Sequence, residues 1–142
     1  MGMKAGRLPK AENQMRAGTP DTQRRISFSF RHIAQAHDKF HYSQRESGYF
    51  CKVLERLSSM SDFTVQEFHA SRSSAVRAHP IDWDSTSEPH GFAHLNEQLR
   101  SSTPFQFAVS ANAYGRVHGF FVDNVFFVVW LDPDHLLYPS KK

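Results

Sequence analysis

The sequence predicts an α+β fold in which an N-terminal strand and a helical hairpin pack against a C-terminal antiparallel sheet. Three observations lead to this class. Apolar residues alternate with polar ones at 26–32, recur at helical spacing at 49–60, and fill three runs between 104 and 131. A period of two is typical of a half-buried strand, and a period near 3.6 of an amphipathic helix. Helices in one block followed by strands in another indicate α+β architecture.

The first strand is expected to begin at Arg25, and the helical hairpin is expected at 43–73. Ser43 and Glu46 have the spacing of a capping box, in which each side chain satisfies a backbone N–H of the first helical turn. Thr64 and Glu67 repeat this spacing and predict the start of a shorter second helix. A single helical turn is expected at 95–99, just before the last three strands.

The apolar runs predict a meander with strands near 104–110, 116–122 and 125–131, preceded by a short strand near 78–82. Asp123 and Asn124 tolerate the positive φ of a tight turn between the last two strands. Because apolar residues fall on both faces of this sheet, loops or a partner chain should cover the second face. The predicted core consists of Phe28, Phe30, Val53, Leu57, Phe68, Phe107, Val109, Phe120, Val122, Phe126, Val128 and Trp130.

Length and composition predict one domain at 25–142 behind a disordered leader at 1–24. The leader region is basic, because residues 1–25 hold six basic and two acidic residues, whereas the rest holds eleven basic and twelve acidic ones. The folded part therefore lacks the clustered charge that drives non-specific binding to polyanions. No apolar run is long enough to span a membrane, and we expect a cytoplasmic protein in which the lone Cys51 is buried as a small apolar residue.

Polar side chains gather around the exit of the meander. Arg116 opens the middle strand, and His118 stands two residues on, which places both on one face of the sheet. Asp132 and His135 follow the last strand, with Tyr138 close behind. Each also has a purely structural explanation. Arg116 could be a solvated residue at the sheet edge, and His118 a hydrogen-bonded histidine within the sheet. Asp132 to His135 could be the turn that ends the strand, and Tyr138 could pack against the sheet edge.

The order of these features resembles the RelE/YoeB/ParE superfamily of bacterial toxin-antitoxin toxins. The stretch that carries the resemblance is GRVHGF at 115–120, the turn at 123–124, the apolar strand at 125–131, and then His135 and Tyr138. The resemblance implies a RelE-like fold and a ribosome-dependent messenger-RNA endonuclease, in which a 2′-hydroxyl attacks its own phosphodiester. Arg116 would match the phosphate-stabilising arginine, His135 and Tyr138 the acid and base, and His118 is a further candidate.

The resemblance also implies partners: a cognate antitoxin that covers the apolar sheet face, and messenger RNA on the ribosome. No cofactor and no metal are expected, although the i, i+4 spacing of His90 and His94 admits a metal hypothesis. Basic groups beside aromatic ones suit single-stranded nucleic acid. The expected RNA-binding residues are Arg31, Lys39, His41, Lys52 and Arg56.

Two alternatives stand beside the endonuclease. One is a non-enzymatic module that binds a protein or forms a homo-oligomer through its apolar sheet face, with the Arg, His and Tyr residues at the rim. The other is a gyrase poison of the ParE type, because members of one fold can differ in chemistry.

Overall fold

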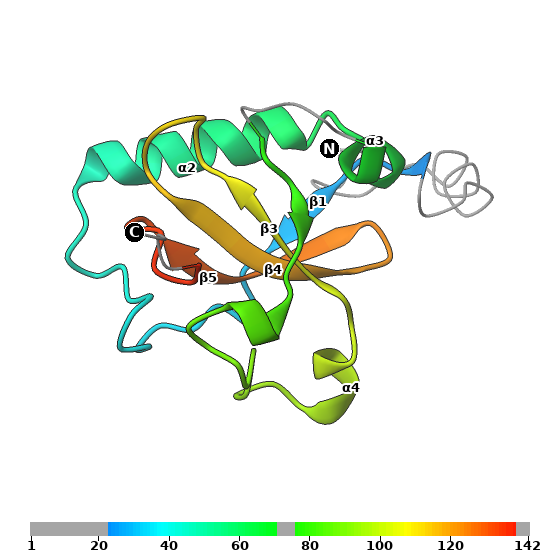
Figure 1. Ribbon diagram of the computed structural model, residues 1–142. Coiled ribbons are helices and arrows are strands. Elements are labelled where there is room, and N and C mark those ends of the chain that lie inside the picture. Colours follow the sequence, from blue (N-terminus) through cyan, green and yellow to red (C-terminus); the bar gives the residue numbers. More distant parts are fainter. Residues whose placement is uncertain (1–22, 71–75, 139–142) are drawn as a thin grey trace, which may run out of the picture.

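A mixed five-stranded sheet forms the centre of the computed structural model, which describes residues 23–70 and 76–138 (Figure 1). The strand order is β1-β5-β4-β3-β2. The α+β class is confirmed, and so is the antiparallel meander of the last three strands. The predicted leader at 1–24 lies outside the described residues except for its last two. The strands are β1 (Ser27–Ser29), β2 (His79–Pro80), β3 (Pro104–Ala108), β4 (Arg116–Val122) and β5 (Val125–Asp132).

The N-terminal strand makes the sheet mixed, because β1 runs parallel to β5 while every other pair is antiparallel. Ser27 is in register with Val125, and the side chain of Asn124 donates a hydrogen bond of 2.9 Å to the Arg25 carbonyl. The predicted turn at Asp123–Asn124 is confirmed, and Asp123 adopts a φ of 55° there. The turn therefore joins β4 to β5 and also fixes the register of the first strand.

The helices are α2 (Ser47–Met60), α3 (Val65–Ala70) and the short α4 (Glu97–Arg100). The capping box at the start of α3 is confirmed, because Thr64 Oγ1 accepts the Glu67 N–H at 3.0 Å and Glu67 Oε1 accepts the Thr64 N–H at 2.8 Å. The capping box predicted at Ser43 is wrong. Glu46 is the N-cap of α2, with an extended backbone and no side-chain cap. The predicted end of the second helix, near position 73, lies outside the described residues.

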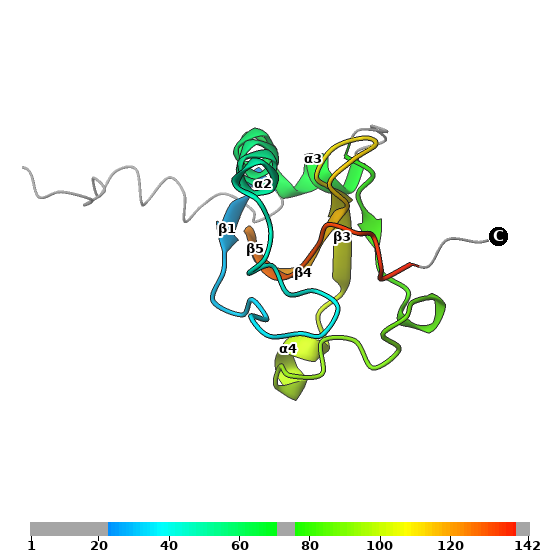
Figure 2. The same cartoon turned by 90° about the vertical axis from the view of Figure 1, so that its left-hand side faces the viewer.

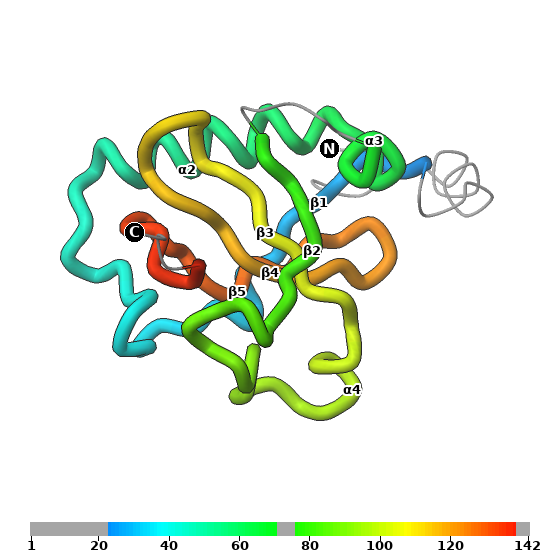
Figure 3. The backbone as a smooth tube through the Cα atoms, in the orientation of Figure 1, coloured from blue at the N-terminus to red at the C-terminus, as the bar shows by residue number. Residues whose placement is uncertain are grey.

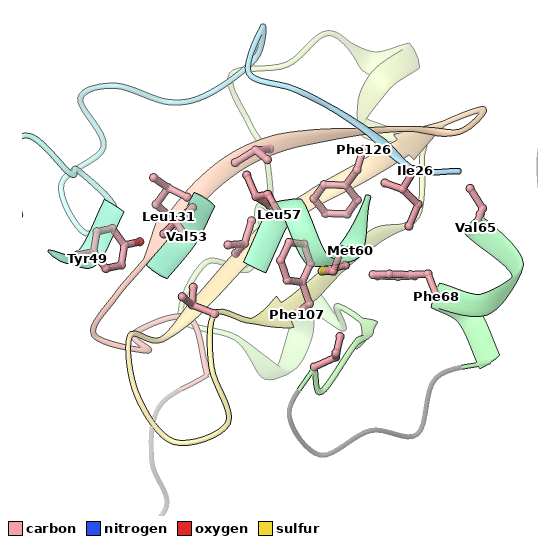
Figure 4. Packing of buried hydrophobic residues seen from close by; sticks show 14 residues of the cluster. Ile26, Tyr49, Val53, Leu57, Met60, Val65, Phe68, Phe107, Phe126 and Leu131 are labelled. Carbon is pink, nitrogen blue, oxygen red and sulfur yellow. The ribbon is translucent and has the colours of Figure 1, made fainter. Parts of the chain in front are cut away.

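Helices α2 and α3 cover one face of the sheet (Figure 2). In α2 the buried residues are Tyr49, Val53, Leu57 and Met60, which follow the helical period and form one apolar stripe. Figure 4 shows these side chains packed against Phe107, Phe126 and Leu131 of the sheet and against Val65 and Phe68 of α3.

Two long loops of the chain itself cover the opposite face, where a second apolar cluster lies between the sheet and the segments 31–46 and 81–100 (Figure 3). Val129 and Trp130 both belong to this cluster, because a bulge in the β4–β5 pairing interrupts the alternation there. The sequence left open whether loops or a partner chain cover the second face, and the structure shows loops. The sequence had also suggested this apolar face as the binding site of an antitoxin or of a second copy, but the chain itself already covers it.

Three expectations about burial are wrong. Phe30 follows the short strand β1 and is 46% exposed, and Val122 lies at the tip of the last hairpin and is 39% exposed. Cys51 is exposed, because it lies about 200° around α2 from Tyr49 and Val53, which face the sheet. Across the described ranges, no helix has the length and apolar character needed to cross a bilayer.

Candidate functional site

The loop between β3 and β4 is pressed against the exit of β5, and Gly115 makes this approach possible. Gly115 has a φ of 69°, and a Cβ atom there would overlap the carbonyl oxygen of Asp132 and crowd the backbone of Pro133. The Val109 N–H donates to the Gly115 carbonyl at 3.1 Å and closes the loop. Two segments some twenty residues apart in the sequence therefore form the walls of one depression.

This depression, which we call the arginine cleft, has a volume of about 390 Å³. Arg77, Arg116 and His135 supply its basic groups, and Asp134 is its acidic residue. The Asp134 carboxylate already forms an ion pair with Arg45, at 2.5 Å from Nη2. The two guanidinium groups therefore dominate the charge of the cleft. Its lining residues are Arg77, Ala111, Asn112, Ala113, Tyr114, Gly115, Arg116, Pro133, Asp134 and His135.

Arg116 is half-buried at the start of β4 and is held by a hydrogen bond from Nη1 to the Gly115 carbonyl at 3.1 Å. Its Nε is buried and has no hydrogen-bond partner among the described residues. Burial, and then the neighbouring charge of Arg77, lower the pKa of Arg116, but an arginine stays protonated in proteins. A fixed positive charge therefore lines the cleft.

Unusual backbone conformations concentrate in this cleft. Among the described residues, four that are not glycine have a positive φ, and three of them line it: Arg77 at 50°, Tyr114 at 67° and His135 at 56°. Such conformations cost energy and cluster at functional sites when the surrounding structure enforces them. The fold therefore concentrates backbone strain around this cleft.

His135 stands in the turn after β5, where its N–H donates to the Asp132 carbonyl at 3.2 Å. Burial lowers the pKa of His135, and the positive charge of Arg116 lowers it further. The imidazole is therefore neutral at neutral pH, and it can accept a proton from a group bound in the cleft.

Directly beneath the turn lies a buried pair, His118 on β4 and Asp132 at the end of β5, with Nε2 and Oδ2 3.0 Å apart. Both side chains are almost completely buried. Oδ1 of Asp132 also accepts the Leu136 N–H at 2.8 Å, and Oδ2 accepts the Leu137 N–H at 3.0 Å. The carboxylate thus ties the chain after the turn back to the sheet and fixes the backbone that carries His135.

The charge state of this pair follows from its surroundings. Burial lowers the pKa of His118 despite the opposing effect of the Asp132 carboxylate. For Asp132, burial raises the pKa, but the hydrogen bonds from His118 and from two backbone N–H groups outweigh it, and the pKa falls. A neutral imidazole therefore donates Nε2–H to an ionised carboxylate. Because His118 is fully buried, it acts on the cleft through Asp132 and has no access to a bound molecule.

The structure brings together only part of the predicted exit cluster. Arg116 and His135 line the cleft, and His118 lies beneath it. Tyr138 does not line it: its hydroxyl accepts the Asp82 N–H at 2.9 Å, and its ring packs on His79 with centroids 5.7 Å apart. The predicted convergence of all four side chains at one edge is wrong for Tyr138, which anchors the chain end beside β2.

The five expected RNA-binding residues do not form one surface. Lys52 and Arg56 lie on α2, where Lys52 pairs with Glu55 at 3.5 Å and Arg56 donates to the Val109 carbonyl at 2.9 Å. The other three are Arg31 after β1, and Lys39 and His41 in the loop over the opposite face, where Lys39 pairs with Glu88 at 2.6 Å.

Two lining residues were not expected from the sequence, Arg77 and Tyr114. Arg77 lies in a stretch without clear periodicity, and its approach to the cleft follows from the placement of β2 beside β3. Tyr114 precedes Gly115 in a loop of small and polar residues, and this composition, typical of a tight turn, was the one signal in the sequence for its position. The residues that the structure describes contain no group of three or more metal-binding side chains, and His94 instead contacts the His32 carbonyl at 3.3 Å.

Comparison of the chain with protein-family models, with curated proteins and with solved structures gives no match in any of the three. The resemblance to the RelE/YoeB/ParE superfamily therefore stays a prediction.

Proposed function

We propose that the arginine cleft binds a phosphodiester of RNA and promotes its cleavage by the adjacent 2′-hydroxyl. The observation that carries the proposal is that two guanidinium groups and a neutral imidazole line one solvent-open depression. Guanidinium groups are suited to phosphate oxygens, and a neutral imidazole can act as a general base at neutral pH. The backbone strain concentrated at Arg77, Tyr114 and His135 supports a functional role for the same cleft.

In this mechanism His135 removes the proton from the 2′-hydroxyl, and the 2′-oxygen attacks the phosphorus. Arg116 and Arg77 stabilise the negative charge that grows on the phosphoryl oxygens. The bond to the 5′-oxygen then breaks, and water, which reaches the open cleft, protonates this leaving group. The products are a 2′,3′-cyclic phosphate and a 5′-hydroxyl. His118 and Asp132 are positioning residues here, because they hold the turn that carries His135.

This chemistry agrees with the RelE-like toxin that the sequence resembles, and we extend the proposal to that role: a cytoplasmic toxin that acts on messenger RNA at the ribosome and is neutralised by an antitoxin. The order of an N-terminal strand, a helical hairpin and a meander supports this assignment. The loops 31–46 and 81–100 cover the second sheet face, so an antitoxin would bind at the cleft or on the outer surface of the helices.

The test is cleavage of a single-stranded RNA by the purified protein, alone and with ribosomes, together with growth after induced expression in bacteria. Arg116→Ala should lower the cleavage rate by about 10²–10³, the usual effect of removing one group that stabilises developing charge. His135→Ala should lower it by about 10²–10⁴, the usual contribution of a general base. Arg100→Ala is the matched control, because this exposed arginine at the end of α4 does not line the cleft. A substrate with 2′-deoxyribose at the cut site should be resistant. Equal rates for wild type and both cleft variants would refute the proposal.

A further inference from the structure

A second cleft adjoins the arginine cleft and shares three of its residues, Tyr114, Pro133 and Asp134. Its volume is about 440 Å³, and the mechanism proposed above makes no use of it. The other lining residues come from the start of α2 and the segment before it: Gln44, Arg45, Glu46, Gly48 and Tyr49. We call this depression the tyrosine cleft.

Tyr114 forms the wall between the two clefts. Its side chain is 40% exposed, which is unusual for an aromatic residue of this chain, and its backbone is held at a φ of 67°. Gly115 anchors the loop against the exit of β5, and Tyr114 and Arg116 on either side of this glycine both line the arginine cleft. An exposed ring next to a cationic site is the pairing with which proteins hold single-stranded nucleic acid, since bases stack and phosphates meet cations.

The tyrosine cleft also offers hydrogen-bonding groups. Arg45 and Asp134 form a forked pair, with Nη2 2.5 Å from Oδ2 and Nη1 3.5 Å from Oδ1. An arginine has five N–H donors and a carboxylate has lone pairs on both oxygens, so this pair keeps donors and acceptors for another partner. The Asp134 side chain is 52% exposed, so part of the carboxylate remains accessible. A base edge carries donors and acceptors of the same kind.

We propose that the tyrosine cleft binds the nucleobase that flanks the phosphodiester in the arginine cleft, with the base stacked on Tyr114 and its edge near Arg45 and Asp134. The inference rests on the proposed function for the position of the phosphate, and it adds the recognition of a base beside it. Tyr114 is then a binding residue for a single-stranded ribonucleotide, and a neutral base stacks there without any change in protonation. Because every base has a π-face, stacking alone tolerates all four bases.

The experiment measures binding by calorimetry with two probes: the 2′-O-methylated dinucleotide ApA, which cannot be cleaved, and the same sugar-phosphate without either base. Wild type should bind ApA about ten-fold or more tightly than the abasic probe, in line with the effect of one stacked base. Tyr114→Asn should remove this ratio, since asparagine tolerates the positive φ but has no ring. Tyr114→Trp should retain it. Arg116→Ala should weaken both probes by a similar factor.

The outcomes separate the two proposals. If wild type binds both probes equally and Arg116→Ala weakens them, the phosphate site stands and the base site is refuted. The base site is also refuted if Tyr114→Asn keeps the full ratio while its thermal unfolding matches wild type. If wild type binds neither probe, the proposed function fails, and the inference fails with it.

Discussion

The buried carboxylate of Asp132 allows a sharp test, because it holds the sheet and the site together through three hydrogen bonds. We consider Asp132→Asn, which keeps the size of the side chain and replaces one acceptor oxygen by an NH2 group. The carboxylate accepts from His118 Nε2 at 3.0 Å, from the Leu136 N–H at 2.8 Å and from the Leu137 N–H at 3.0 Å. In the variant, the NH2 group must face at least one of these donors.

The magnitude follows from burial. A hydrogen bond to a charged group contributes about 1.5–3 kcal/mol, and a buried donor left without an acceptor costs about 1–3 kcal/mol. We therefore expect Asp132→Asn to lower the free energy of unfolding by about 2–4 kcal/mol, which is a large part of the roughly 5–15 kcal/mol typical of a domain. With a urea m-value of about 2 kcal/mol/M, the midpoint should fall by about 1–2 M.

The assay is urea unfolding followed by tryptophan fluorescence, since buried Trp130 lies two residues from the substitution. Asp134→Asn is the matched control: it makes the same change in the same turn, but at an exposed ion pair with Arg45 that contributes about 0–1 kcal/mol. If the two variants unfold within 0.5 kcal/mol of each other, the buried carboxylate does not hold the chain end as we describe.

Two further predictions concern stability. Gly115→Ala should leave the protein largely unfolded in a circular dichroism melt, because its Cβ would overlap the Asp132 carbonyl and the backbone there has a positive φ. Gly48→Ala has open space around it and should raise the free energy of unfolding by about 0.5–1 kcal/mol. Equal melting temperatures for the two variants would contradict this prediction. Acidification should also destabilise the protein. Burial lowers the pKa of His118 and of His135 below the ordinary 6.5, so the unfolded chain binds more protons than the folded protein. The free energy of unfolding should therefore fall as the pH drops below about 6.5. Urea midpoints that stay constant from pH 7.5 to pH 5.5 would contradict this prediction.

Local patterns in the sequence predicted the elements of the fold well. The helical period of 49–60 and the three apolar runs gave the correct helix and meander, because amphipathic spacing reflects which face is buried. The capping signature at Thr64 was right and the one at Ser43 wrong, although their spacing is the same. Thr64 directly precedes the first residue of α3, so it occupies the N-cap position. Helix α2 begins only at Ser47, so Ser43 lies in the preceding loop and Glu46 occupies the N-cap position instead.

The site was predictable in part: Arg116 and His118 lie on a regular strand, and His135 follows the last strand directly. Arg116 and His118 share a face because they are two residues apart on a strand, and this held. The association of Arg77 and Tyr114 with His135 depends on three loops that meet in space, and all three residues adopt a positive φ that side chains normally avoid. The sequence placed Tyr138 near His135 by number alone, whereas the Tyr138 hydroxyl accepts a hydrogen bond from the Asp82 backbone N–H, away from the cleft.

The parallel pairing of β1 with β5 has a consequence for how the chain acquires its shape. Ser27 meets Val125 only after almost a hundred intervening residues have been made, and Ile26 and Phe28 pack in the main core beside Phe126. During synthesis the first strand can therefore pair only after β5 has been made. Such distant pairing slows folding. The cleft likewise gains its second wall only when the exit of β5 has been made, because residues 133–135 follow that strand.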